Sequence, residues 1–72
     1  MRTRVATFDR ESDADMVANY LHIRILPRRG YQRVFAEGRE VFLESSRQPS
    51  FDVNHDINAF VSGFKAGRLE RD

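Results

Sequence analysis

The stretch Ile23-Arg-Ile-Leu-Pro27-Arg-Arg-Gly30-Tyr-Gln-Arg-Val-Phe-Ala-Glu37 decides the fold, because two local structures fit it and each implies a different architecture. In the first, residues 27–37 form a helix. Pro27 suits the first helical position, where its missing N–H costs nothing. Gly38 follows where a left-handed residue commonly ends a helix. The apolar residues between them share one face at spacings of three and four: Tyr31, Val34 and Phe35.

In the second structure, the same stretch forms a β-hairpin. Apolar and polar residues alternate over Leu21–Ile25, Pro27-Arg-Arg-Gly30 turns the chain, and a strand begins at Tyr31. Each structure has one cost. Gly30 inside a helix costs about 1 kcal/mol relative to alanine, whereas Val34-Phe35-Ala36 breaks the alternation of a half-buried strand. We favour the helix and keep the hairpin as the alternative.

The flanking segments complete an α+β fold in both interpretations. Thr3–Phe8 is short and apolar, as a strand would be, and Ser12 is a good N-cap for a first helix over about 13–22. Glu40–Glu44 and Ser50–Val53 are typical of two strands joined by a turn. A final helix ends near Gly67 and has apolar residues three and four positions apart: Val53, Ile57, Phe60, Val61 and Phe64.

Seventy-two residues are enough for one domain, which we expect to span residues 1–72. A chain this short buries only about 60% of the surface that it exposes when unfolded, and it has no cysteine to add a disulfide. The N-terminal residues contain no apolar run of the kind found in signal peptides, and no segment has the length of a membrane span. We therefore expect a cytoplasmic protein.

Charge is unevenly distributed along the chain, although the net charge is only +1. Four acidic residues lie close together near the N-terminus: Asp9, Glu11, Asp13 and Asp15. Four arginines then follow with no acidic residue among them: Arg24, Arg28, Arg29 and Arg33. A GC-rich genome would explain many arginines but not their clustering. Because the guanidinium fork suits phosphate and guanine, the cluster indicates an anionic partner.

The favoured order of helix, turn, helix, two-stranded wing and helix resembles the small winged-helix domains of phage excisionases and MerR-type regulators. Ala18–Ile23 is similar to their first helix, and Arg28–Arg39 is similar to their recognition helix with the Glu-Gly-Arg that leads into the wing. Gly38–Ser45 resembles an excisionase wing strand, and Asp56–Phe60 resembles the helix that follows. The resemblance covers roughly residues 14–62.

This resemblance implies sequence-specific or architectural binding of double-stranded DNA. The chain would act in phage DNA recombination, beside an integrase and copies of itself, or in transcription regulation as a small repressor. Arg28, Arg29 and Arg33 would lie near the start of the recognition helix, where side chains reach base edges. Arg24 and Arg47 would hold phosphates.

No residue pattern indicates catalysis, so we expect no enzyme, no cofactor, no metal and no catalytic residue. His22 and His55 are far apart in sequence, and no cysteine accompanies them. The hairpin alternative gives a different fold, a β-α-β-β-α sandwich, and a different function. The best function is then a small protein-binding module, such as a phage-encoded inhibitor of a host enzyme. Its acidic and basic segments would serve complementary docking.

Overall fold

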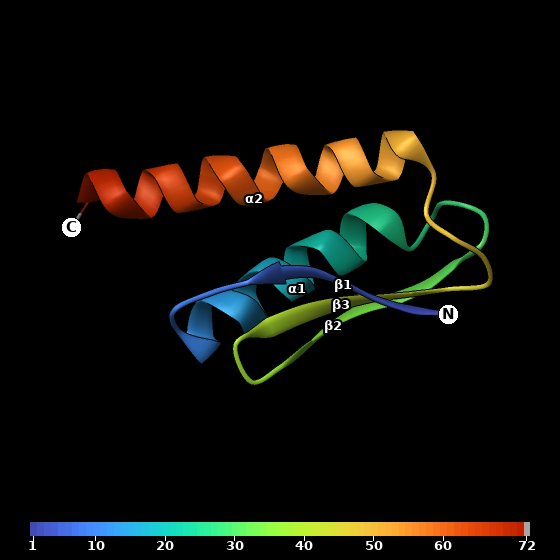
Figure 1. The fold of residues 1–72 in the computed structure, drawn as a ribbon, viewed down its shortest axis with the longest axis horizontal. Helices are drawn as coiled ribbons and strands as arrows, with labels where there is room; N and C mark the ends of the chain where they lie inside the picture. The colour runs from blue at the N-terminus through green and yellow to red at the C-terminus, as the bar shows by residue number, and fades with distance from the viewer. Residues whose placement is uncertain (72) are drawn as a thin grey trace.

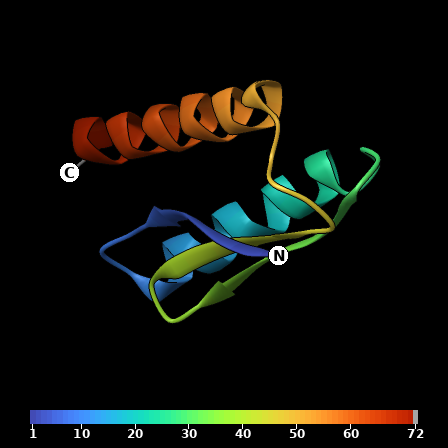
Figure 2. The ribbon, with the colours of Figure 1, turned by 45° about the vertical axis from the view of Figure 1, so that its right-hand side comes forward.

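The computed structural model describes residues 1–71, with side chains described as far as Gly67. Three antiparallel strands form one sheet in the order β1-β3-β2. Both helices lie on one face of this sheet, with α1 across β2 and β3 and α2 beside β1 and α1 (Figures 1 and 2). The elements in chain order are β1 (Arg2–Thr7), α1 (Glu11–Ile25), β2 (Tyr31–Glu37), β3 (Glu40–Ser45) and α2 (Phe51–Arg71).

The second helix that we favoured over residues 27–37 is wrong, because these residues form a turn and β2. Gly30 has a φ of +90°, which lies outside the helical region and which residues other than glycine rarely adopt. Its carbonyl accepts the N–H of Ser46 at 2.9 Å. The alternative order β-α-β-β-α is therefore correct. In that alternative, Leu21–Ile25 was expected to be extended, but it forms the last turns of α1.

The run Val34-Phe35-Ala36, which we counted against a strand, has apolar side chains on both faces of β2. Val34 and Ala36 pair with two buried residues of β3, so they belong to the core face. Phe35 pairs with Phe42, and their rings stack with centroids 5.7 Å apart. Because this pair lies on the face away from the helices, the strand has no simple alternation of apolar and polar residues.

The loops on either side of β3 differ from the expected wing. Gly38 and Arg39 join β2 to β3, and Gly38 has a φ of +59° while Arg39 keeps a negative φ, as in a type II′ turn. The returning strand expected over Ser50–Val53 is wrong, because α2 begins there. The N–H of Val53 donates to Oγ of Ser50 at 3.4 Å, so Ser50 caps this helix.

The expected first strand and final helix are confirmed with small changes in their bounds. Ser12 is not the cap of α1, because the helix begins at Glu11 and Arg10 holds the N-cap position without a side-chain bond. Gly67 does not end α2, which continues to Arg71. Among the described residues, no helix combines the length and apolarity needed to cross a bilayer.

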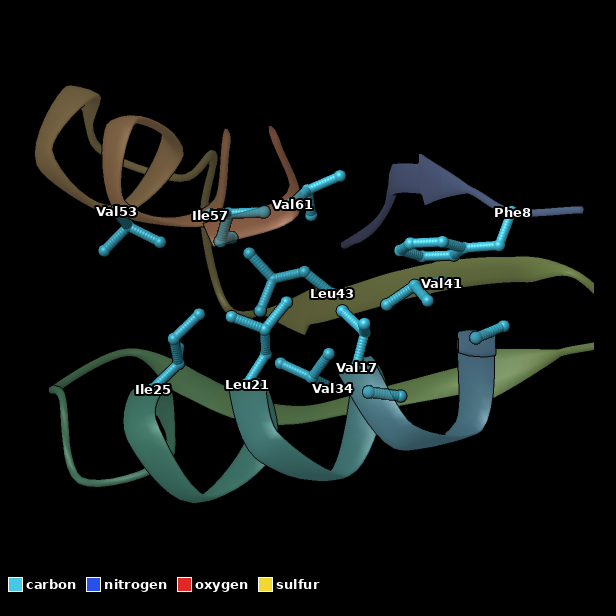
Figure 3. Close-up of a cluster of buried hydrophobic side chains, with 12 residues drawn as sticks. Phe8, Val17, Leu21, Ile25, Val34, Val41, Leu43, Val53, Ile57 and Val61 are labelled. Carbon is cyan, nitrogen blue, oxygen red and sulfur yellow. The ribbon is translucent and has the colours of Figure 1, made fainter. Parts of the chain in front are cut away.

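The core lies between the sheet and the two helices (Figure 3). The stripe predicted for the final helix is confirmed, since Val53, Ile57 and Val61 are buried and Phe60 and Phe64 are packed beside them. The remaining buried apolar residues come from α1, β2, β3 and the segment after β1: Phe8, Ala14, Val17, Ala18, Leu21, Ile25, Val34, Val41 and Leu43.

Candidate interaction surface

Four of the five arginines predicted to contact DNA gather at one end of the molecule. At this end α1 finishes, residues 26–30 turn into β2, and residues 46–50 lead from β3 into α2 (Figure 1). The bond between Ser46 and Gly30 joins these two loops. We call this surface the arginine end, after its four basic residues: Arg24, Arg28, Arg29 and Arg47.

Asp56 of α2 organises one half of the arginine end. Nη2 of Arg28 donates to Oδ2 of Asp56 at 2.6 Å, which ties the turn after α1 to α2. This hydrogen bond is the main cause that lowers the pKa of Asp56, and the charges of Arg28 and Arg24 lower it further. Arg24 and Arg28 therefore both lie near this carboxylate, and Arg28 is held by it.

Tyr31 organises the other half. Its hydroxyl accepts the N–H of Ser50 at 3.1 Å and lies 3.5 Å from Oγ of the same residue. These bonds lower the pKa of Tyr31 against the opposing effect of burial, and the positive charges of Arg47 and Arg28 add to the lowering. Arg47 and Arg28, which come from the two opposite loops, therefore both act on the hydroxyl of Tyr31.

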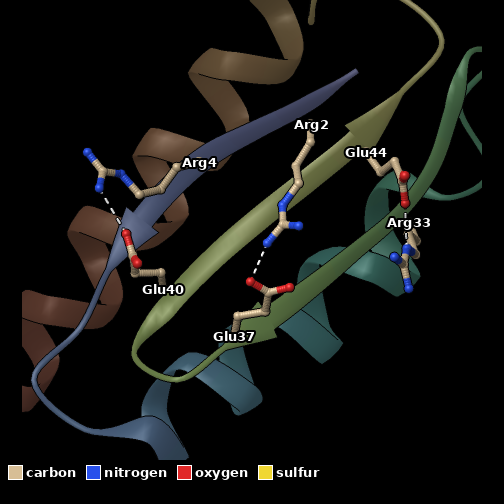
Figure 4. A network of polar contacts seen from close by, with 6 residues as sticks. All are labelled: Arg2, Arg4, Arg33, Glu37, Glu40 and Glu44. Carbon is tan, nitrogen blue, oxygen red and sulfur yellow. Dashed lines mark hydrogen bonds and ion pairs between the residues drawn. The ribbon is translucent and has the colours of Figure 1, made fainter.

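Arg33 is not part of this surface. It lies on the outer face of the sheet, the face away from both helices, where its Nε donates to Oε2 of Glu44 at 2.6 Å (Figure 4). Its guanidinium also lies 4.2 Å from the centroid of the Phe35 ring. The hydrogen bond from Arg33 lowers the pKa of Glu44. Two further arginines on this face have acidic partners: Arg2 with Glu37, and Arg4 with Glu40 at 2.9 Å.

Three guanidiniums at the arginine end remain available. Arg24, Arg29 and Arg47 are exposed, and within residues 1–67 none of them forms an ion pair. Each has several N–H donors arranged to receive the oxygens of a carboxylate or a phosphate. The outer face, by contrast, has its arginines paired with glutamates.

Exposed apolar side chains accompany these arginines. Phe51, the first residue of α2, is 81% exposed and its ring stacks on that of His55 with centroids 6.1 Å apart. Leu26, directly after α1, is also exposed. Neither residue was predicted to belong to a site, and Phe51 was expected in a strand. The position of Phe51 outside the stripe that begins at Val53 was the available signal.

The histidines and carboxylates up to residue 67 do not gather into a metal-binding group. In the part of the chain that the structure describes, no group of three histidine, aspartate or glutamate side chains could hold a metal ion. His22 has a structural contact instead. Its Nδ1 accepts the backbone N–H of Val34 at 3.1 Å, and Val34 lies on an edge strand of the sheet. This bond joins α1 to the outer edge of β2.

Comparison of the chain with protein-family models, with curated proteins and with solved structures gives no match. The function is therefore argued from the surface itself.

Proposed function

We propose that this chain is a small protein-binding module that docks its arginine end onto an acidic and partly apolar surface of another protein. The observation that carries the proposal is the mixture of side chains at this end. Arg24, Arg29 and Arg47 form no ion pair among the described residues, and Leu26 and Phe51 are exposed at the same end. Arginine and aromatic residues are the types most enriched where protein interfaces concentrate their binding energy.

This mixture favours a protein surface over the DNA that the sequence suggested. A DNA backbone presents dense negative charge and offers little for exposed apolar side chains to cover. Residues 27–37 were expected to form the helix that carries arginines into the major groove, but they form a turn and a strand. Two aspartates, Asp52 and Asp56, lie at the start of α2 at the same end. The net charge of +1 gives no long-range attraction to a polyanion.

The charge distribution over the molecule supports the same proposal. α1 runs from the acidic segment at residues 9–15 to the arginine end, so these two segments lie at opposite ends of α1 (Figure 1). A partner surface with an acidic patch would attract one end and repel the other, which fixes the orientation of docking. An inhibitor of an enzyme is one member of this functional class.

The test uses peptides, because a peptide library presents every combination of acidic and apolar residues. The protein is immobilised through its C-terminus and used to select binders from a random displayed library. The proposal predicts enriched peptides that combine aspartate or glutamate with leucine, phenylalanine or tryptophan. Fluorescence anisotropy of a selected peptide then gives its Kd for the unmodified protein and for Arg29→Glu/Arg47→Glu, which should bind at least about tenfold more weakly.

The matched control is Arg10→Glu/Arg39→Glu, which makes the same change in charge at the opposite end of the molecule. It should retain the Kd of the unmodified protein within about twofold. If both double variants lost the same affinity for the peptide, the effect would come from net charge alone, and the proposal would be overturned. A labelled DNA duplex forms the second arm. Tight binding of the duplex that weakens steeply with salt, together with no peptide enrichment, would replace the proposal with DNA binding.

A further inference from the structure

His22 of α1 closes part of the outer edge of β2. This strand lies at one side of the sheet, so alternate backbone groups along it point away from β3. Glu37 and Glu40 flank the two-residue turn and form the hydrogen-bonded pair that closes it. The alternation that follows bonds Phe35 to β3 and directs the N–H of Val34 outward. Nδ1 of His22 accepts this N–H at 3.1 Å.

The backbone groups beside this N–H have no partner. The C=O of Val34 and both backbone groups of Ala36 point outward as well, and none of them forms a further hydrogen bond within the described residues. An unpaired strand edge of this kind is a template for a strand of another chain. The ring of His22 stands where such a strand would place a carbonyl group, so His22 protects the edge.

The bond between His22 and Val34 needs a neutral imidazole. A neutral ring has one acceptor nitrogen, whereas a protonated ring has an N–H donor on both nitrogens and no acceptor. Protonation at Nδ1 of His22 would therefore set two donors against each other at 3.1 Å. Histidine is the side chain whose charge ordinarily changes between about pH 5 and pH 8. The bond is thus lost when the ring takes up a proton on acidification.

The charged groups of the elements packed against α1 face away from this ring. Those of β2 and β3 all lie in ion pairs on the outer face of the sheet: Arg33 with Glu44, Glu37 with Arg2, and Glu40 with Arg4. α2 packs on the opposite side of α1, because Tyr20 stacks on Phe60 and lies about 200° around the helix from His22.

Two charged residues of α1 lie within two turns of His22. Arg24 is about 200° around the helix from His22, and its charge acts on Asp56 of α2. Asp15 shares the face of His22 but lies about 10 Å away along the helix axis, a distance over which physiological salt screens exposed charges. The bond to Val34 is therefore the closest polar influence on the ring.

We infer that His22 is a pH-sensitive switch at the edge of β2. Its neutral ring closes the edge at Val34, and its protonated ring leaves that edge open. Acid thus exposes the unpaired backbone groups of residues 34–36 without separating the strands, because Phe35 stays bonded to β3. The switch does not involve the arginine end and does not rest on the proposed function.

Hydrogen exchange of the backbone amides, followed by NMR between about pH 8 and pH 5, tests the switch. The rates are converted to protection factors, which removes the intrinsic dependence of exchange on pH. The protection factor of Val34 should fall about three- to tenfold on acidification, as expected for the loss of one hydrogen bond. The amide of Phe35, which is bonded to β3, should keep its protection factor within about twofold.

His22→Asn is the matched variant, because Oδ1 of asparagine takes the place of Nδ1 as acceptor and does not titrate. Val34 should keep a constant protection factor in this variant. His55→Gln removes the other histidine and should retain the fall at Val34. A protection factor of Val34 that does not change with pH in the unmodified chain would overturn the inference. A fall that persists in His22→Asn, that is absent in His55→Gln or that Phe35 shares equally would also overturn it.

Discussion

Replacing Gly30 by alanine distinguishes the turn from the helix by the sign of its effect on stability. In the structure Gly30 has a φ of +90°, and an L-residue forced to a positive φ costs about 1–2 kcal/mol. A Cβ at this position would lie 3.4 Å from Oγ of Ser46, which is ordinary contact and adds little. In a helix over residues 27–37 the same replacement would instead stabilise the protein by about 1 kcal/mol.

Urea unfolding followed by far-ultraviolet circular dichroism measures this difference. With an m-value of about 1 kcal/mol per molar urea, the midpoint of Gly30→Ala should fall by about 1–2 M. Gly63→Ala is the matched control, because Gly63 lies inside α2 and a Cβ there would meet nothing within 4 Å. That variant should be more stable by about 0.5–1 kcal/mol. A raised midpoint for Gly30→Ala would refute the turn.

Three further predictions concern the packing and the polar contacts. Leu21 is fully buried, so Leu21→Ala should lower the free energy of unfolding by about 2–5 kcal/mol in urea unfolding; a loss well below 1 kcal/mol would contradict its place in the core. The pKa of Asp56 is lowered by its bond to Arg28, so the stability from this pair is complete above the ordinary aspartate pKa and is lost as the pH falls through the folded-state value. Urea midpoints measured against pH should therefore fall less on acidification in Asp56→Asn, and an equal fall would count against the pair. His22→Ala removes the acceptor of the Val34 N–H and should cost about 1 kcal/mol while speeding hydrogen exchange at that amide; His22→Asn, which keeps an acceptor oxygen, should exchange more slowly than the alanine variant.

The final helix could be predicted from the sequence because its pattern is local. Val53, Ile57 and Val61 repeat at helical spacing, and no other element is needed to explain them. β2 could not be predicted in this way. Phe35 breaks the alternation of apolar and polar residues that is typical of a strand. Its ring lies against Phe42 and the guanidiniums of Arg2 and Arg33. Phe42 and Arg2 come from other strands, so these contacts cannot be seen in the sequence around Phe35.

The arginine cluster was visible in the sequence, but its composition depended on the fold. Arg33 leaves the cluster because successive residues of a strand point to opposite faces, and its neighbour Val34 faces the core. Arg47 joins the cluster because Ser46 is bonded to Gly30 across two loops. The acidic partner of Arg28 comes from α2, which no pattern near residue 28 could indicate.

We propose that the arginine end docks onto an acidic, partly apolar protein segment. Titration of the ¹⁵N-labelled chain with a library-selected peptide, followed by amide chemical shifts, tests it most directly. We predict that the largest changes fall on residues 24–30 and 46–52, while the amides of β1 and the outer face of the sheet stay nearly unchanged. Changes centred on the outer face, or changes produced only by a DNA duplex, would contradict the claim.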